Sequence, residues 1–265
     1  MADVRNIYRF LDRIAPFRTQ EDFDNAGFLV GWGDREVNRI LVALDITGEV
    51  AGEAARWGAE LIVAHHPVIF NPVKSVTDES LVGRVLLELV ENKIAAICAH
   101  TNLDAAHGGV NGCLARALEL TGIGQLCQSG VDDRGRPYGI GRTGTAHRPG
   151  LSAAEYAAFV KEKLGCACVR FADGGRQVSK VAVGGGACGS MLEDALAQGC
   201  DTFVTADLKY NQFLDARALG LNLLDAGHFP TENVVCAPLA RRLAKEFPQV
   251  EVMVSQVHTE VCSNV

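Results

Sequence analysis

Short apolar runs alternate along most of the chain with segments in which apolar residues recur every three or four positions. Runs rich in Val, Ile and Leu are typical of β-strands, and the longer spacing is typical of helices with one face on a core. The runs that predict strands cover residues 39–46, 60–66, 93–100, 180–185, 201–207 and 221–227. Because these runs are apolar almost throughout, we expect mostly parallel sheets buried on both faces. The pattern therefore predicts an α/β fold.

Helical spacing occupies the intervals between these runs, most clearly in residues 79–92, 108–122 and 189–199. The first sixteen residues place Ile7, Phe10, Leu11 and Ile14 on one helical face with charges between them, unlike the apolar run of a signal peptide. A serine at 152 with a glutamate at 155 forms a capping-box pattern, which predicts that another helix begins near residue 152.

The rhythm breaks between residues 125 and 150, where turn-forming residues dominate the stretch DDRGRPYGIGRTG. We therefore place a boundary there, with an N-terminal α/β lobe over residues 1–125 and a C-terminal α/β lobe over residues 126–265. Each lobe would contain βα units, and the two are of similar size.

Composition and charge narrow the possible partners. Apolar residues make up 48% of the 265 residues and charged residues 22%, which is ordinary for a globular protein. A net charge of −7 with no stripe of Lys or Arg argues against nucleic acid as a partner. No run approaches the roughly 20 apolar residues that span a bilayer, so we expect a soluble cytoplasmic protein. The nine cysteines are expected to be reduced.

The chemistry-bearing residues gather where the predicted strands end. Ligands of open parallel sheets collect at the carboxyl ends of the strands. Five of the seven histidines fall at or just beyond such ends, namely His65, His66, His100, His107 and His228. Asp104, Asp207 and Glu232 follow the same predicted strands, so carboxylates and imidazoles would share one rim.

This set predicts two metal ions rather than one. Adjacent His65 and His66 point in opposite directions if the strand continues, so they suit neighbouring ions. Pro230 suits the first position of a helix, which would place Glu232 in its first turn, close to His228. Imidazoles with carboxylates suit Zn²⁺, Fe²⁺ or Mn²⁺. Five candidate ligands leave positions open for water or substrate, and they are His65, His66, Asp104, His228 and Glu232. The alternative is that these are polar strand ends satisfied by hydrogen bonds.

Other polar residues have open roles. His100 would orient a ligand or move a proton. Asp207 would orient a water or cap the next helix, and Asp24 and Asn25 would either approach the site or serve a turn. The segment Gly184–Gly189 matches G-x-G-x-x-G, which alone would suggest a dinucleotide cofactor, but it lies deep in the second lobe. A phosphate-bearing substrate on the helix N-terminus is the better ligand, and a glycine turn without a ligand is the other interpretation. Of the remaining two histidines, His147 is expected in a surface loop and His258 in the last strand.

Several motifs together resemble one known family. They are HHPVIF, AHTNLDAAHGGVN, VAVGGGACG, DTFVTADLKYN and LLDAGHFPTENVV, in that order, preceded by DNAGFLVG at residues 24–31. In order and spacing they are similar to the NIF3-like family, the GTP cyclohydrolase 1 type 2-like proteins. The short turn-rich stretch after residue 125 resembles the form without a mid-chain inserted domain. Ala206 and Asn211 differ from the family pattern, which often has Gly and His there.

The resemblance implies a two-lobed α/β protein with a dinuclear metal site between the lobes, and commonly a toroidal hexamer. Carried over by motif, the metal ligands are His65, His66, Asp104, His228 and Glu232. The implied function is a metal-dependent hydrolase acting on a nucleotide or another small heterocyclic or phosphorylated molecule. A metal-binding scaffold or regulator without turnover is the alternative, and the sequence assigns no catalytic acid or base.

Overall fold

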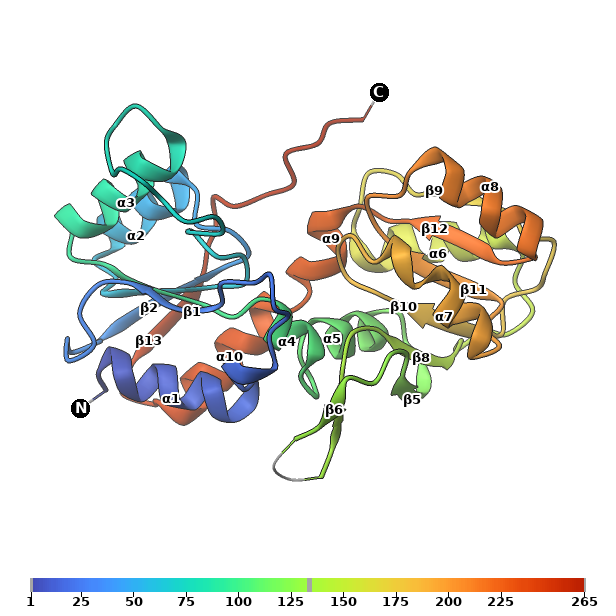
Figure 1. The fold of residues 1–265 in the computed structure, drawn as a ribbon, viewed down its shortest axis with the longest axis horizontal. Helices are drawn as coiled ribbons and strands as arrows, with labels where there is room; N and C mark the ends of the chain where they lie inside the picture. Colours follow the sequence, from blue (N-terminus) through green and yellow to red (C-terminus); the bar gives the residue numbers. More distant parts are fainter. Residues whose placement is uncertain (1, 133–134, 265) are drawn as a thin grey trace. The chain divides into compact units, whose positions relative to one another are not determined.

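The computed structural model describes residues 2–132 and 135–264, and its contacts divide the chain into two compact units (Figure 1). Unit 1 comprises Met1–Leu103 and Cys236–Thr259, and unit 2 comprises Asp104–Val235 and Glu260–Val265. The main segment of unit 2, Asp104–Val235, is therefore inserted into the sequence of unit 1, and residue 125 lies inside unit 2. The helix at Ala153–Leu164 is preceded in unit 2 by other helices and strands.

Unit 1 is built on a five-stranded sheet in the order β1-β4-β3-β2-β13. Strands β2 (Arg39–Ala43), β3 (Leu61–Ala64), β4 (Ala95–Cys98) and β13 (Glu251–Val254) are parallel, and β1 (Gly27–Val30) runs antiparallel to β4. Every residue of β3 and β4 is buried, as their continuous apolar runs predict. Figure 1 shows α1 (Val4–Ile14) and α10 (Cys236–Glu246) on one face, with α2 (Gly48–Trp57) and α3 (Leu81–Glu91) on the other.

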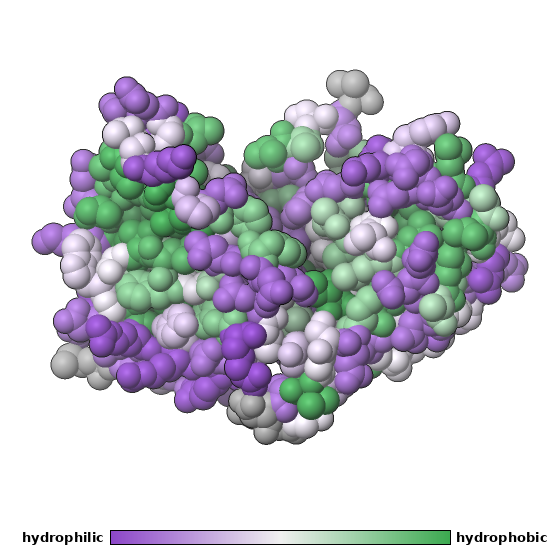
Figure 2. Space-filling model, in the orientation of Figure 1, coloured by the Kyte–Doolittle hydropathy of each residue, from purple (hydrophilic) through white to green (hydrophobic). Residues whose placement is uncertain are grey.

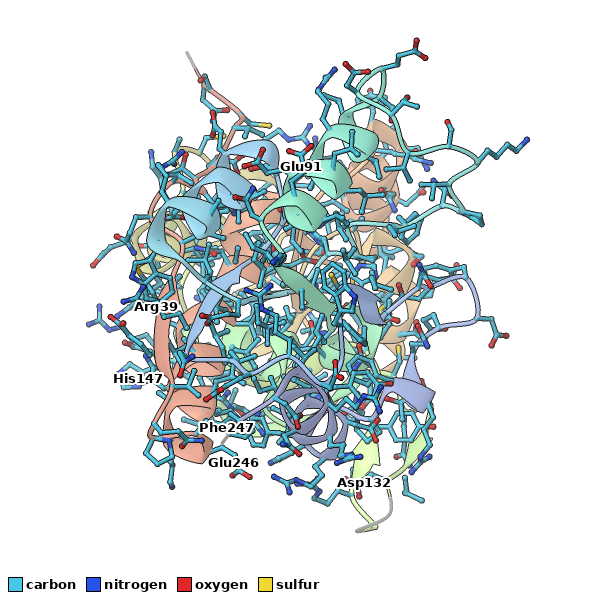
Figure 3. All side chains as sticks on the ribbon, turned by 90° about the vertical axis from the view of Figure 1, so that its left-hand side faces the viewer. Arg39, Glu91, Asp132, His147, Glu246 and Phe247 are labelled. Atoms are coloured by element: carbon cyan, nitrogen blue, oxygen red, sulfur yellow. The ribbon has the colours of Figure 1, made fainter. Side chains whose placement is uncertain are left out.

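The first helix forms where the sequence predicts it. The side chain of Asp3 caps α1 by accepting from the amide of Asn6, and the apolar stripe of the helix is buried. At the end of α10, Phe247 packs edge-on against Phe10 with ring centroids 5.7 Å apart, and Glu246 pairs with Arg13 (Figure 3). These contacts attach α10, which is distant in sequence, to α1.

Unit 2 is built on a six-stranded sheet in the order β5-β8-β10-β11-β12-β9. Strands β10 (Lys180–Val183), β11 (Thr202–Thr205) and β12 (Asn222–Asp225) are parallel. The flanking strands β5 (Thr121–Gln125), β8 (Arg142–Thr145) and β9 (Arg170–Ala172) are antiparallel to their neighbours. A separate two-stranded hairpin is formed by β6 (Gly130–Val131) and β7 (Pro137–Tyr138).

Two apolar clusters cover the two faces of the second sheet. One joins Val181 and Val183 to side chains of α5 (Val110–Ala117) and α6 (Ala153–Leu164). The other joins Ala182 and Phe203 to α7 (Leu192–Ala197) and α8 (Tyr210–Leu219). Alternate residues of β10 thus pack on opposite faces, as the pleat of a strand requires.

The predicted α/β fold with mostly parallel sheets is confirmed, with a few local differences. All six predicted strands form, and Ser152 and Glu155 make the capping box that begins α6. The helix expected over residues 108–122 ends at Ala117, because the chain then enters β5. His258 is not in the last strand, since β13 ends at Val254, whereas His147 lies in an exposed loop as predicted (Figure 3).

The surface agrees with the absence of an apolar span in the sequence. Hydrophilic side chains are spread over the visible face of each unit, with apolar areas between them (Figure 2). Within residues 2–132 and 135–264, none of the helices has the length and apolarity needed to cross a membrane.

Candidate metal centre

Three histidines meet at the carboxyl edge of the unit 1 sheet. His65 and His66 directly follow β3, and His100 follows the neighbouring strand β4. Their ring centroids lie 4.9 to 5.5 Å apart, and one nitrogen of each ring lies within 4.8 Å of the others. The parallel register of β3 and β4, in which Ala64 lies opposite Cys98, delivers these side chains to one place.

Each of these rings is held through its Nδ1 atom. His65 Nδ1 lies 2.8 Å from the carbonyl oxygen of Ala99, and a carbonyl can only accept a hydrogen bond. In the neutral ring the proton is therefore on Nδ1, and Nε2 carries the lone pair. His66 and His100 place Nδ1 2.7 and 2.8 Å from carboxylate oxygens of Asp45 and Asp24. Acceptors at Nδ1 orient histidines that bind metals through Nε2.

Asp24 belongs to this cluster, as one of its two predicted roles required. Its carboxylate accepts hydrogen bonds from His100 and from the amide and hydroxyl of Thr101. Burial alone would raise the pKa of Asp24, but the hydrogen bonds from His100 and Thr101 hold the pKa at about 2. Its neighbour Asn25 donates to the carbonyl of Ile69 at 2.6 Å, which ties this turn to the loop after His66.

The depressed pKa of Asp24 predicts an acid-sensitive contribution to stability. Because the folded pKa is below the unfolded value, this contribution is present above about pH 4 and is lost as the pH falls through about 2. We expect Asp24→Asn to cost about 1–2 kcal/mol in free energy of unfolding at pH 6 and much less at pH 2.5. Urea unfolding of the metal-free proteins at both pH values measures this. An equal cost at both would contradict the prediction.

In unit 2, a short helix carries the second pair of predicted ligands. The helix α9 (His228–Asn233) begins three residues after β12, and His228 Nε2 lies 2.9 Å from an oxygen of Glu232 one turn later. The expectation that Pro230 begins this helix is wrong by two residues, because His228 is its first residue. Pro230 is still within the first turn, where a missing N–H costs nothing.

Carboxylates surround His228 on both sides. Its Nδ1 lies 2.7 Å from Asp207, and Glu232, which is 4% exposed, faces its Nε2. The hydrogen bond with Glu232 raises the pKa of His228 to about 9, with a further contribution from Asp207 and against the effect of burial. The ring therefore carries a proton at neutral pH, which a metal ion has to displace.

Asp207 contacts His228 and does not cap the next helix, which was one of its two predicted roles. It follows β11 and orients His228, while Lys209 is the N-cap residue of α8. Its backbone is in the left-handed region with a φ of 55°, which Asp tolerates better than most residues. The strand-end rule located this residue, because β11 and β12 are adjacent and parallel.

Asp104 is the third predicted ligand in unit 2. It lies in α4 (Thr101–Ala105), is 7% exposed, and has a carboxylate oxygen within 4.8 Å of one of Glu232. The carbonyls of the next two residues, Ala105 and Ala106, accept hydrogen bonds from the buried guanidinium of Arg142. This clamp fixes the end of the helix that carries Asp104.

The glycine segment Gly184–Gly189 makes hydrogen bonds to side chains around this site and not to a phosphate group. The amides of Gly185, Gly186 and Cys188 donate to the side chains of Asn111, Thr231 and Thr205 at 2.8 to 3.1 Å. These N–H groups are therefore not available to a dinucleotide or phosphate. A Cβ on Gly186, whose φ is +66°, would lie 2.1 Å from a Glu232 oxygen and 3.1 Å from His228 Nε2. The glycine leaves the space in which this pair sits.

The sequence analysis did not identify Asp45 and Arg142 as supporting residues, and it placed His107 at the rim with the candidate ligands. Asp45 ends a predicted strand, so the rule that found Asp207 also applies to it. Arg142 has no comparable signal, because its partners are backbone carbonyls. His107 lies in an exposed turn, and the potential metal-holding groups found among residues 2–132 and 135–264 do not include it.

Comparison with known proteins gives the family. Residues 2–261 match the model of the Duf34/NIF3 (NGG1p interacting factor 3) family. The chain belongs to the Duf34/NIF3 family. Two relatives of this NIF3 chain are named GTP cyclohydrolase 1 type 2 homolog. The one from Clostridium perfringens is 34% identical over 96% of each chain. The one from Streptomyces coelicolor is 38% identical over 88% of this chain and 82% of its own.

Solved structures agree with the NIF3 assignment and with the fold. The Bacillus cereus protein related to NIF3 has a TM-score of 0.93 at 25% identity, covering 100% of this chain and 99% of its own. The hypothetical protein SA1388 of Staphylococcus aureus has a TM-score of 0.92 at 29% identity, covering 99% of both chains. The resemblance predicted from the sequence motifs of this NIF3 chain is confirmed.

Proposed function

We propose that this protein binds two divalent metal ions through His65, His66, Asp104, His228 and Glu232 and hydrolyses a small molecule with them. The observation that carries the proposal is a hydrogen-bonding arrangement that the histidines share. Each of the three proposed histidine ligands has Nδ1 on an oxygen acceptor, which directs Nε2 to a ligand position. His100, at the same rim as His65 and His66, is held in the same way by Asp24, so these three rings are oriented around one place.

The donor set fits such ions. Neutral imidazole nitrogens with carboxylates suit Zn²⁺, Fe²⁺ or Mn²⁺ better than Mg²⁺ or Ca²⁺. Unit 1 supplies His65 and His66, and unit 2 supplies Asp104, His228 and Glu232. The proposal requires both units to bind the same pair of ions.

The proposed chemistry uses the bound metal ions and one histidine beside them. Bound divalent ions would activate water and polarise an oxygen of the substrate. His100 lies beside the proposed ligands without being one of them, and its Nδ1 rests on Asp24. We assign to it the transfer of a proton during hydrolysis, because its ring lies beside the proposed ligands and the Asp24 carboxylate fixes its orientation.

A nucleotide or another heterocyclic or phosphorylated molecule is the proposed substrate. Relatives from Helicobacter pylori are named GTP cyclohydrolase 1 type 2, and one of them is 32% identical over 88% of each chain. Phe70 follows the His65-His66 segment, is 45% exposed, and lies edge-on to His100 with centroids 6.1 Å apart. An exposed aromatic ring of this kind offers a surface on which a heterocycle stacks.

Elemental analysis of the purified chain tests the metal site. We expect about two ions per chain in the wild type and a large loss in the double variant His65→Ala, Glu232→Ala, because one ligand is removed from each unit. The matched control is His147→Ala, an exposed loop histidine in unit 2. A wild type that binds no metal after reconstitution, or a double variant that keeps both ions, would contradict the proposal.

Turnover separates the hydrolase from a metal-binding scaffold, which is the alternative. A panel of nucleotides, phosphoesters and cyclic amides is assayed with added Mn²⁺, Zn²⁺ or Fe²⁺. Turnover that requires metal and is lost in Glu232→Ala supports the enzyme. Uniform inactivity of a metal-loaded homo-oligomer, such as the hexamer that the family resemblance implies, supports the scaffold.

A further inference from the structure

Asp45 joins two histidines that are far apart in the sequence. It follows β2, and its Oδ1 lies 2.7 Å from Nδ1 of His66, the proposed metal ligand. Its Oδ2 lies 3.2 Å from Nε2 of His258, which comes after the last strand. The His258 side chain is 9% exposed, whereas Asp45 is 40% exposed. Each of the two carboxylate oxygens of Asp45 thus contacts a different histidine.

The segment that carries His258 is itself fixed to the core of unit 1. The hydroxyl of Ser255 and the amide of Gln256 donate to the two oxygens of Glu53, at 2.5 and 2.9 Å. Glu53 lies on α2 and is a buried carboxylate. The amide of Ser255 also donates to the carbonyl of Val42 in β2, so the segment starts at a defined place beside the strand that leads to Asp45.

A partly exposed carboxylate orients a ring more firmly when both of its oxygens are held. With only His66 as a partner, the Asp45 side chain could rotate about its bonds to Cβ and exchange the contact for water. The second contact, from a nearly buried imidazole on an anchored segment, removes that freedom.

We infer that His258 is a positioning residue of the metal centre, and that the segment Ser255–His258 orients His66 through Asp45. This inference rests on the proposed metal-binding function. It assigns a role to the chain after the last strand, which the sequence motifs of the site do not include. The prediction is that metal affinity depends on His258 only while Asp45 is present.

A double-mutant cycle on metal affinity tests the inference. Zn²⁺ affinity is measured by competition with a chromophoric chelator in the full chain, for wild type, Asp45→Ala, His258→Ala and the double variant. Loss of a carboxylate that orients a metal-bound histidine costs about 10–100-fold in affinity, so we expect this for Asp45→Ala. We expect a smaller loss, about tenfold or less, for His258→Ala, and no further loss when it is added to Asp45→Ala.

Two further measurements separate positioning from general loss of structure. His258→Gln, whose amide nitrogen can reach Asp45 much as Nε2 does, is expected to restore most of the affinity. The spectrum of the Co²⁺-loaded protein is expected to change in His258→Ala and to return in His258→Gln. His147→Ala is the matched control and is expected to bind Zn²⁺ like the wild type.

Each outcome decides one of two claims. If His258→Ala lowers affinity equally with and without Asp45, the residue does not act through Asp45 and the inference fails. If His258→Ala binds Zn²⁺ like the wild type while Asp45→Ala is weakened, the inference fails and the proposed metal site stands. If the wild type binds neither Zn²⁺ nor Co²⁺, the proposed function fails and the inference fails with it.

Discussion

Replacing Gly186 by alanine will strip the metal from the His228–Glu232 half of the proposed centre. The added Cβ would lie 2.1 Å from a Glu232 oxygen and 3.1 Å from His228 Nε2, so the two ligands have to move apart or turn away. The glycine segment cannot give way easily, because the carbonyl of Gly186 accepts from the amide of Ala206 and the hydroxyl of Thr205. We expect metal affinity to fall by about 10–100-fold, as for the loss of a group that orients a ligand.

Gly199→Ala is a matched control for this substitution. Gly199 has a φ of +72°, close to the +66° of Gly186, but a Cβ there would have no atom within 4 Å. Both variants bear the cost of a left-handed alanine, about 1–2 kcal/mol in free energy of unfolding. Isothermal titration with Zn²⁺ should therefore separate them, with Gly199→Ala binding like the wild type. Equal affinities in both variants would mean that Glu232 and His228 do not bind metal together.

The proposed ligands could be predicted from the sequence, but most of what orients them could not. Imidazoles and carboxylates directly after apolar strands mark the carboxyl edge of a parallel sheet, and this rule located His65, His100 and Asp207. The contacts of Asp45 with His66 and His258 depend on which strands are neighbours and on the path of the chain after β13. The glycine segment was open to a second interpretation, since its spacing also fits phosphate binding, and only the acceptors of its amides decide against that.

The fold shows the same division between local and tertiary information. Strands such as β3 and β4 were predictable, because buried parallel strands are apolar throughout. The antiparallel strands β5, β8 and β9 were missed, since they are short, polar or rich in glycine. The return of α10 and β13 to unit 1 has no local signal, because β13 pairs with β2 across some two hundred residues.

Replacing Arg142 by methionine is expected to be the most destabilising change outside the apolar core of unit 2. The guanidinium is 4% exposed and donates to four backbone carbonyls, those of Gly139, Gly141, Ala105 and Ala106, at 2.7 to 3.2 Å. Burial lowers the pKa of Arg142 to about 10, so the group is still a cation at neutral pH. Methionine fills similar space but removes these four hydrogen bonds and the charge, while each carbonyl keeps one other donor, such as the amide of Gly139 for Ala105 and the amide of Gly109 for Ala106.

The expected cost of Arg142→Met is about 2–4 kcal/mol in free energy of unfolding, because four hydrogen bonds from a buried cation are lost and each contributes roughly 0.5–1.5 kcal/mol. Lysine should recover only part of this, since one ammonium cannot reach both pairs of carbonyls. Arg136→Met is the control, because its partly exposed ion pair with Asp132 is worth less than about 1 kcal/mol. Urea unfolding of the metal-free proteins, with hydrogen exchange in β10 and β12 to locate the effect, measures all three.

The same substitution links the stability of unit 2 to its proposed metal ligand. Arg142 holds the carbonyls of the two residues after Asp104, so its loss frees the end of α4 and with it the direction of the Asp104 carboxylate. We therefore expect Arg142→Met to weaken Zn²⁺ binding even at temperatures where the variant is folded, whereas Arg136→Met should not. A variant that is destabilised but binds Zn²⁺ like the wild type would show that Asp104 is oriented by other contacts or is not a ligand.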